Sequence, residues 1–427
     1  MRIAIIGTGI SGLGAAWLLH KTHDISVYEA QPRLGGHSRT LVVDYDGEQI
    51  PVDAGFVVYN NQNYPNLKAL FEQLHVATEP SDMSFAVSTA NGEIEWGSDN
   101  LNTLFAQRRN LFRPKFLSTL LNIRRFNQIA PIDLANGVLS GLTLGEYLDH
   151  RNFPGIFRSH YLFPMGGAIW SMPAQGMNKF PAESFVAFCQ NHYLMAQKRP
   201  RWRTVSGGSH EYVKKITAPF SRKIRIATAV TKIIREPGRV RVCDATGGMD
   251  VYDHVIIAAH ADQTLAMLDN ASTQERQILG EFYYAPNTAY VHRDPALMPH
   301  LKQVWSSWNY LSCGNMQPAV SVSYWMNRLQ NIPRDKPLFI TLNAPQPPRS
   351  ELTFAEIQYE HVQYDLPALN AQHRLAEIQG TGNIWYCGAW TGHGFHEDGL
   401  ASGLAIAERI GKCTRPWNIA AITSQAA

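Results

Sequence analysis

The chain opens with RIAIIGTGISGLGAAWLL, residues 2–19, and this stretch decides the fold. Its apolar start predicts a β-strand, its glycines predict a tight turn, and the apolar positions after Gly12 predict a helix. Gly7 permits the sharp turn, Gly9 lets a pyrophosphate approach the backbone, and Gly12 lets the helix pack on the strand. The sequence therefore predicts a dinucleotide site whose phosphates meet the free N–H groups of a helix N-terminus.

A second predicted strand, residues 25–28, delivers an acidic side chain to the same site. Glu29 follows that strand at the spacing where a carboxylate accepts hydrogen bonds from ribose hydroxyls. The fingerprint alone leaves NAD and FAD open. The segment Arg33-Leu34-Gly35-Gly36 brings a second glycine pair, where the backbone can approach the cofactor again. A simple NAD domain has no need of this pair, so FAD is favoured.

Composition places the chain among ordinary globular proteins. Its 427 residues exceed the usual size of one hydrophobic core, so two lobes are expected. Hydrophobic residues make up 45%, and a net charge of +3 is too small to indicate a nucleic-acid partner. The five cysteines are scattered without a C-x-x-C pair, which argues against a disulfide framework or a zinc site and predicts a reducing, cytoplasmic location. No apolar run reaches the about 18 residues that span a bilayer, so at most a peripheral membrane contact is expected.

Composition also changes along the chain, and the changes predict an α/β fold with two discontinuous domains. After residue 78 the sequence turns to aromatic, proline and basic residues without a second nucleotide fingerprint. The Rossmann-like FAD-binding domain is expected to comprise residues 1–78, 203–262 and 376–413, the mixed α+β substrate domain residues 79–202 and 263–375, and a frayed tail residues 414–427.

One segment of the substrate domain, residues 105–129, combines apolar residues at helical spacing with six basic residues. Two interpretations are open. A helix packed on the core with a solvated basic face is the simpler one. A helix that lies on an anionic lipid surface also accounts for the pattern.

A second site-like unit lies near the C-terminus. Residues 382–387 predict a strand, residues 388–399 form a glycine-rich loop, and residues 400–410 have helical periodicity. Asp398 is expected to cap that helix and Gly399 to open it. Such a helix N-terminus can stabilise negative charge on a reduced flavin ring.

Two histidines and a glutamate in this loop superficially suggest a metal site. His393, His396 and Glu397 form H-x-x-H-E, which matches neither H-E-x-x-H nor H-x-x-E-H and lies in a loop, so no metal is expected. Two interpretations of His396 remain. It is either a proton donor or substrate contact beside the flavin, or a hydrogen-bonded histidine that holds the loop.

Three of these blocks together resemble the flavin amine oxidase superfamily, which includes monoamine and polyamine oxidases, protoporphyrinogen oxidase and carotenoid desaturases. They are the fingerprint up to Glu29, the second glycine pair and the loop before the last helix. The resemblance implies FAD bound without a covalent link, because no cysteine matches the attachment site of monoamine oxidases. It implies that the cofactor is contacted by Gly7, Gly9, Ser11, Gly12, Glu29, Ala30, Arg33, Gly35, Gly36, His37, Ser38, Val230, Gly388, Glu397, Asp398, Gly399 and Leu400. Within this set Val230 faces the adenine, and residues 388–400 face the ribityl chain and the isoalloxazine.

Two departures from the family pattern bear on function. The family commonly has arginine directly after the second glycine pair, whereas here His37 stands there and Arg39 follows two residues later, so which of them contacts the cofactor is open. Phe395 matches one wall of the aromatic cage of amine oxidases but lacks the polar edge, which speaks against amine specificity. Phe395 and His396 are the predicted catalytic residues.

A further likeness covers nearly the full chain. Several segments look like bacterial NAD/FAD-binding oxidoreductases and like the N-terminal half of plant cyclopropane fatty acid synthases. These segments are Gly36–Thr40, Glu79–Phe85, Ala168–Ser171, His292–Asp294 and Gly394–Leu400. In the plant enzymes a methyltransferase half follows, so this chain is expected to be the free-standing flavoprotein half. The likeness implies a lipid context and a cyclopropane fatty acid synthase as partner.

Three functions follow as hypotheses. The leading one is an FAD-dependent oxidoreductase that transfers hydride from an apolar, fatty-acyl or lipid substrate to flavin N5, as a desaturase or isomerase does. The second is a flavin amine oxidase acting on a small amine, and the third is a non-catalytic flavoprotein partner of a cyclopropane fatty acid synthase. Because a second G-x-G-x-x-G is absent, electrons are expected to leave to oxygen, a quinone or a protein, or to return to the substrate.

Overall fold

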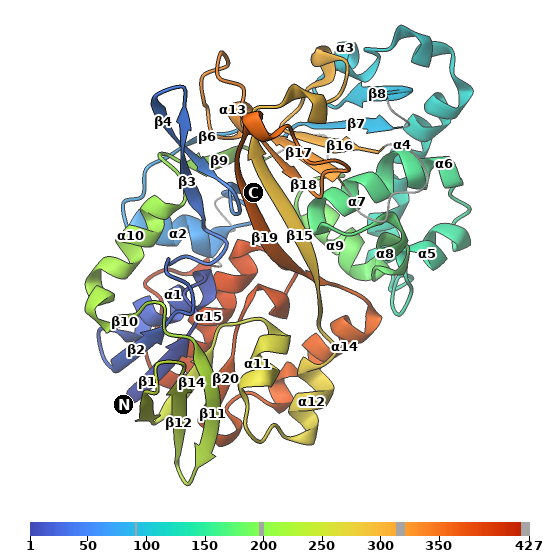
Figure 1. The fold of residues 1–427 in the computed structure, drawn as a ribbon. Coiled ribbons are helices and arrows are strands. Elements are labelled where there is room, and N and C mark those ends of the chain that lie inside the picture. The colour runs from blue at the N-terminus through green and yellow to red at the C-terminus, as the bar shows by residue number, and fades with distance from the viewer. Residues whose placement is uncertain (90–91, 196–199, 313–320, 420–427) are drawn as a thin grey trace.

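The computed structural model describes residues 1–89, 92–195, 200–312 and 321–419, which form two lobes (Figure 1). The lower lobe in Figure 1 is built on a parallel sheet of five strands, in the order β10-β2-β1-β14-β20. Their bounds are β1 (Arg2–Ile6), β2 (Asp24–Tyr28), β10 (Ile224–Arg225), β14 (His254–Ile257) and β20 (Ile384–Tyr386). Segments far apart in the sequence thus supply one sheet, and the predicted α/β class is confirmed.

Both faces of the parallel sheet are covered. Side chains alternate along a strand, so Ile3 and Ile5 point to one face and Ala4 and Ile6 to the other. The first face packs against α1 (Ile10–Leu19), α2 (Pro65–Gln73), α10 (His210–Thr217) and α15 (His396–Gly411). The second packs against α11 (Ala261–Met267), α12 (Thr273–Leu279), α14 (Leu366–Arg374) and the antiparallel strands β11 (Val230–Glu236), β12 (Arg239–Asp244) and β13 (Met249–Tyr252). Ile278, which the predicted boundaries assign to the substrate domain, belongs to this second cluster.

Helices α1 and α15 cross at very short distance because glycines face the contact. A Cβ on Gly14 would lie 2.7 Å from Cδ1 of Leu400, and a Cβ on Gly399 would lie 2.9 Å from the Ser11 hydroxyl. A Cβ on Gly403 would overlap the carbonyl oxygen of Ser11. This crossing brings the N-terminus of α15 beside the first glycine turn.

The upper lobe contains a mixed sheet of seven strands in the order β19-β15-β18-β17-β16-β7-β8. Their bounds are β7 (Phe85–Thr89), β8 (Ile94–Gly97), β15 (Tyr283–His292), β16 (Trp308–Leu311), β17 (Ser321–Trp325), β18 (Phe339–Leu342) and β19 (Thr353–Gln363). The long strands β15 and β19 pair antiparallel and run down from this sheet to the lower lobe in Figure 1. They connect the two lobes.

Helices close the right-hand side of the upper lobe in Figure 1. They are α3 (Leu101–Leu104), α4 (Pro114–Ala135), α5 (Leu144–His150), α6 (Gly155–Phe157), α7 (Phe163–Trp170), α8 (Ala174–Lys179) and α9 (Ala182–Asn191), with α13 (Met326–Leu329) at the top of the lobe. Aromatic residues of α4, α7 and α9 share one buried cluster that contains Phe126, Trp170, Phe185 and Phe188. Within the described ranges, no helix combines the length and the apolar composition that a membrane crossing requires.

Small sheets and one buried carboxylate join the lobes. The sheets are β3 (Thr40–Tyr45) with β4 (Glu48–Asp53), and β5 (Val58–Asn60) with β9 (Trp202–Val205) and β6 (Thr78–Pro80). Asp53 accepts hydrogen bonds from the Ser209 N–H (2.8 Å) and from Nε2 of Gln330 (2.9 Å). Burial raises the pKa of Asp53 to about 6. This carboxyl group ties the second hairpin strand to the loop after α13.

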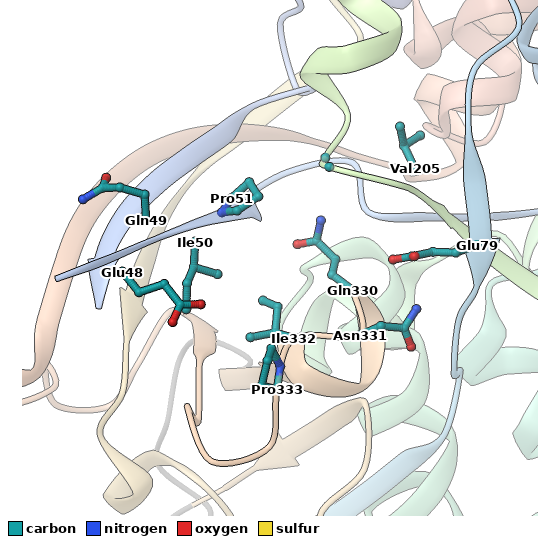
Figure 2. A pocket seen from close by; sticks show the side chains of 12 residues that line it. Glu48, Gln49, Ile50, Pro51, Glu79, Val205, Gln330, Asn331, Ile332 and Pro333 are labelled. Atoms are coloured by element: carbon teal, nitrogen blue, oxygen red, sulfur yellow. The ribbon is translucent and has the colours of Figure 1, made fainter. Parts of the chain in front are cut away.

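A hollow lies beside this contact, and Figure 2 shows Glu79 reaching into it from the side opposite Glu48 and Gln49. Two of its polar side chains, Gln330 and Asn331, already have partners within the protein. Gln330 binds Asp53, and Nδ2 of Asn331 donates to the carbonyl of Pro80 at 2.9 Å. The hollow therefore lies where the two lobes pack against each other.

The local elements predicted at the two ends of the lower lobe are confirmed. The strand and helix predicted within residues 2–19 are β1 and α1, the strand predicted at residues 25–28 is β2, and the strand predicted at residues 382–387 is β20. The predicted cap of the last helix is wrong. The helix begins at His396, and Asp398 accepts a hydrogen bond from the Phe395 N–H (2.9 Å) from inside the first turn. Gly399 therefore lies within the helix.

The start of the tail is anchored, contrary to the prediction of a frayed segment. Arg415 forms an ion pair with Glu408 (2.7 Å), and Trp417 stacks on Trp17 with ring centroids 5.8 Å apart. Nη1 of Arg415 also donates to Oδ1 of Asn66 at 2.8 Å. Residues 420–427 lie outside the described residues, as does Cys313.

The α1–α15 crossing predicts a strong penalty for any side chain at its centre. Gly403→Ala should lower the free energy of unfolding by about 2–3 kcal/mol, because the new Cβ must displace the Ser11 backbone. Urea unfolding measures the change. Gly155→Ala is the control, since a Cβ at Gly155 meets no atom within 4 Å. Equal stability of the two variants would contradict the close crossing.

Candidate functional site

The first glycine turn leaves open space at one position. Gly7 has φ +103°, and its N–H donates to the carbonyl of Tyr28 at 2.8 Å, which fixes the turn after β1. A Cβ on Gly12 would overlap the Gly7 carbonyl, so Gly12 serves the packing of helix on strand. A Cβ on Gly9 would meet no heavy atom within 4 Å. The backbone at Gly9 is therefore accessible to a phosphate group.

The second glycine pair lies directly on the first turn. Gly35 and Gly36 have φ of +103° and +57°, and a Cβ on Gly36 would lie 3.0 Å from Cα of Gly9. The Gly35 N–H donates to the carbonyl of Thr8 at 3.1 Å. Nη1 of Arg33 donates to the Gly36 carbonyl at 2.7 Å and holds the pair in place. The two glycine motifs thus form one backbone-lined surface.

Glu29 lies at the end of β2, beside the first glycine turn. Its carboxylate is buried and accepts hydrogen bonds from the N–H groups of Thr8 (3.0 Å) and Gln31 (2.8 Å). The Thr228 N–H donates to the Glu29 carbonyl at 2.7 Å, which brings the start of β11 with Val230 to the same place. Ala30, next to Glu29, is exposed. The residues expected at ribose and adenine are therefore neighbours in space.

The N-terminus of α15 is held by Glu397. Its Oε1 accepts hydrogen bonds from the backbone N–H (2.9 Å) and Nδ2 (2.7 Å) of Asn66, and its Oε2 accepts from the Leu67 N–H (3.0 Å). Burial raises the pKa of Glu397 to about 7. Both carboxylate oxygens are thus engaged by the first turn of α2, so the side chain joins two helices. Because the side chain of Glu397 is used in this contact, the flavin contact predicted for Glu397 falls to its backbone.

His396 is enclosed on three sides. Its Nε2 lies 2.9 Å from both the Ser38 hydroxyl and the Tyr212 hydroxyl, and its ring stacks on Phe56 with centroids 3.9 Å apart. Burial lowers the pKa of His396 to about 3, so the ring is neutral over the physiological range. This geometry favours the interpretation of a histidine that holds the loop, and it links the loop to the second glycine pair through Ser38.

Phe395 belongs to an aromatic wall that the upper lobe supplies. The Phe188 ring stacks on Phe395 with centroids 4.7 Å apart, and the Trp170 ring meets Phe395 edge-on at 6.3 Å. Nε1 of Trp170 donates to the carbonyl of His393 at 3.2 Å, which fixes the loop against α7. Burial lowers the pKa of neighbouring His192 to about 4, so this side chain is also neutral. At neutral pH these residues contribute no charge to the wall.

Several buried polar atoms between the lobes have no hydrogen-bond partner among the described residues. They include Nε2 of His37, Nδ1 of His361 and the hydroxyl of Tyr364. The rings of His37 and His361 lie 5.6 Å apart, and a Cβ on Gly394 would lie 3.0 Å from the Tyr364 hydroxyl. Buried polar groups are normally paired, so these atoms are placed to bind a polar ligand. His37 follows the second glycine pair and the Tyr364 hydroxyl lies beside Gly394 in the loop before α15, so these atoms lie in the direction in which a dinucleotide on Gly9 would extend.

The structure therefore places most predicted cofactor residues close together, around the two glycine motifs and the loop before α15. Gly388 closes the loop, since its N–H donates to the Ser402 hydroxyl at 3.1 Å. The side chains of two predicted residues, Ser11 and Leu400, also lie in the α1–α15 contact. The prediction missed Asn66 and Tyr212, which hold Glu397 and His396 from 331 and 184 residues away. No local pattern marks such partners.

Comparison with known proteins agrees with this geometry. The family described as flavin containing amine oxidoreductase matches residues 10–292, well over half of the chain. The chain belongs to the flavin-containing amine oxidoreductase family. The family description makes it a flavin-containing oxidoreductase, which agrees with the FAD expected from the glycine motifs. Cys387, the cysteine nearest in sequence to the flavin loop, is fully buried in the core of the lower lobe.

Individual relatives of this oxidoreductase are distant. The chain is 22% identical over 294 residues to a probable zeta-carotene desaturase of Synechococcus elongatus, covering 63% of this chain and 58% of that protein. It is 28% identical over 153 residues to a carotenoid phi-ring synthase of Chlorobaculum tepidum, covering 36% of this chain and 23% of that protein. The chain thus spans under two thirds of the length of these curated relatives.

Solved structures establish the fold of the oxidoreductase over nearly its full length. A redesigned putrescine oxidase has a TM-score of 0.69 at 16% identity, covering 96% of this chain and 99% of that chain. A CLA-producing fatty acid isomerase from P. acnes has a TM-score of 0.67 at 15% identity, covering 96% and 98%. The amine oxidase-like architecture predicted from the three sequence blocks is confirmed.

The raised pKa of Glu397 predicts a defined pH dependence of stability. The folded state holds this proton up to about pH 7, whereas a free glutamate releases it near 4.5, so the wild type loses stability as pH rises between these values. Glu397→Gln removes this loss and should gain roughly 1–3 kcal/mol relative to the wild type over that interval. Denaturant unfolding at a series of pH values measures the difference. A difference that is flat with pH would contradict the assignment.

The surroundings of His396 predict that its loss disturbs cofactor retention and leaves proton transfer unchanged. His396→Ala should lower the free energy of unfolding by about 2–4 kcal/mol, because a stacked, hydrogen-bonded ring is replaced by a cavity. Gel filtration should show partial release of FAD. His292→Ala is the control, since His292 is equally enclosed but lies in the upper sheet. A His396→Ala variant that retains FAD and loses one limb of the pH–rate profile would restore the proton-donor interpretation.

Proposed function

We propose that this oxidoreductase acts on the hydrocarbon part of a fatty-acyl or other lipid substrate, as a desaturase or isomerase does. FAD, when bound, supplies a hydride acceptor at flavin N5. The observation that carries the proposal is the aromatic wall at Phe395, which α7 and α9 of the upper lobe complete with Trp170 and Phe188. A hydrocarbon chain gains free energy by leaving water for such a surface.

The charges around the wall support an apolar substrate over a small amine. A cationic amine needs a carboxylate to offset its desolvation. The carboxylate of Glu397 is directed to α2, and that of Asp398 accepts a hydrogen bond from the Phe395 N–H and lies against Gly392. Phe395 itself offers no polar edge. The wall can orient a C–H bond and exclude water, which are the tasks that flavin chemistry leaves to the protein.

Relatives support the same substrate class through their names alone. The probable zeta-carotene desaturase and the CLA-producing fatty acid isomerase are both named for apolar substrates. Putrescine oxidase, whose fold is similar, is named for an amine. Fold likeness does not choose between these classes, so the choice rests on the wall.

Anaerobic incubation with extracted membrane lipids tests the proposal. The flavin absorption band should bleach, or the products should show loss of two hydrogens or a moved double bond by mass spectrometry. Phe188→Leu should lower kcat/KM for the lipid about tenfold, since stacked aromatic area is lost beside Phe395. Phe71→Leu, an equally buried change in the lower lobe, should leave kcat/KM unchanged. Neither bleaching nor any change in acyl mass or double-bond position would refute the proposal.

Two other outcomes have defined readouts. Peroxide production with monoamines or polyamines would identify an amine oxidase. Co-purification with a cyclopropane fatty acid synthase, with synthase activity unchanged after removal of FAD, would identify a non-catalytic flavoprotein partner.

A further inference from the structure

Exposed apolar side chains gather on one segment of the upper lobe. Of the twelve large apolar residues that are exposed in the described chain, six lie between residues 101 and 132. They are Leu101, Leu111, Phe112, Leu117, Leu121 and Ile132. Phe112 and Leu121 are 86% and 69% exposed. Single exposed apolar residues are normal, whereas a concentration on one segment indicates an interaction surface.

The packing of α4 shows that its core contacts do not account for these residues. Phe116, Thr119, Phe126 and Ala130 form its buried face. Leu117 and Leu121 lie one turn apart on the opposite side. A core-packed helix with a solvated basic face explains the buried residues but would carry polar residues at positions 117 and 121. The outer face of α4 is therefore apolar as well as basic.

Charge on the same segment has one sign. Residues 100–132 contain six arginines and lysines and no aspartate or glutamate. Arg113 contacts Glu93 at 3.8 Å, and Nη2 of Arg109 donates to the Glu93 carbonyl at 2.7 Å. Lys115 and Arg124 are exposed and form no ion pair with another described residue. Two exposed cations without an ion pair in the described chain thus lie on the same helix as the exposed leucines.

We propose that this surface docks on an anionic lipid bilayer. We call it the apolar–basic patch and define it by Leu111, Phe112, Leu117, Leu121, Lys115 and Arg124. Apolar side chains enter the acyl boundary while lysine and arginine bind lipid phosphates at the surface. The unpaired cations fit the phosphate layer of such a surface, and the exposed apolar residues fit its acyl boundary.

A second copy of the chain fits the patch poorly. A two-fold interface would set the same patch against itself and bring its cations together without acidic partners. An anionic bilayer satisfies both halves of the patch at once.

Helix α4, which carries most of the patch, lies on the right of the upper lobe in Figure 1, away from the parallel sheet. The buried face of α4 contributes Phe126 to the cluster that also contains Trp170 and Phe188, against which Phe395 packs. One helix therefore separates the aromatic wall from the proposed membrane surface. Docking does not depend on the proposed reaction, because vesicle binding is measured without turnover.

Co-sedimentation of the FAD-loaded protein with vesicles tests docking. Binding to mixed phosphatidylcholine–phosphatidylglycerol vesicles should exceed binding to pure phosphatidylcholine vesicles and should weaken at high salt. The double variant Phe112→Ser/Leu121→Ser should bind the mixed vesicles at least roughly tenfold more weakly. Lys115→Glu/Arg124→Glu should also lose roughly tenfold or more, and only on the anionic vesicles.

Matched controls lie on the lower lobe. Met249 on β13 is 67% exposed, so Met249→Ser removes an equally exposed apolar side chain and should leave binding unchanged. Exposed Arg239 on β12 gives the charge control Arg239→Glu. Equal binding of patch and control variants would overturn the proposal, as would equal binding to both kinds of vesicle. A lipid-free dimer that Phe112→Ser/Leu121→Ser dissociates would also overturn it, by showing that the patch binds a second copy.

Discussion

The close crossing of α1 and α15 is the contact on which the site depends. Gly14 and Gly403 have no side chain to separate the helices, so the backbone of α15 reaches Ser11. Dispersion contacts and burial of Leu400 stabilise this arrangement. The crossing places the start of α15 against the first glycine turn, although the two are separated by most of the chain. A cofactor that lies on Gly9 can therefore be reached by the loop before α15.

Hydrogen bonds at the start of α15 then fix its orientation. Glu397 binds the first turn of α2, His396 binds Ser38 and Tyr212, and the Asp398 carboxylate binds the Phe395 N–H. Each bond joins the helix to a different part of the site. Burial keeps His396 neutral and raises the pKa of Glu397 to about 7. These groups lie in an interior from which water is excluded. They hold the loop that carries Phe395, the residue that contacts the upper lobe.

The upper lobe contributes the aromatic surface on which the proposed substrate class rests. Its helices present Phe188 and Trp170 to Phe395, and one of them, α4, carries apolar residues on both sides. The inner side of this layer of helices makes the buried aromatic contacts, and its outer side carries the exposed leucines. The candidate site and the proposed lipid surface therefore lie on the two sides of one layer of helices. The proposed lipid substrate and the proposed membrane-docking patch thus rest on the same helical layer.

Short-range patterns in the sequence were sufficient for the strand–turn–helix unit, the second glycine pair and the loop before the last helix. They determine backbone conformation within a few residues, as the positive φ at Gly7, Gly35 and Gly36 shows. The family followed from their combination. Tertiary structure alone decided that Glu397 binds Asn66, that His396 stacks on Phe56 and that Leu117 and Leu121 face outward. Such contacts depend on which distant elements pack together, and a side chain's burial, protonation and partner are set by that packing and not by its neighbours in sequence.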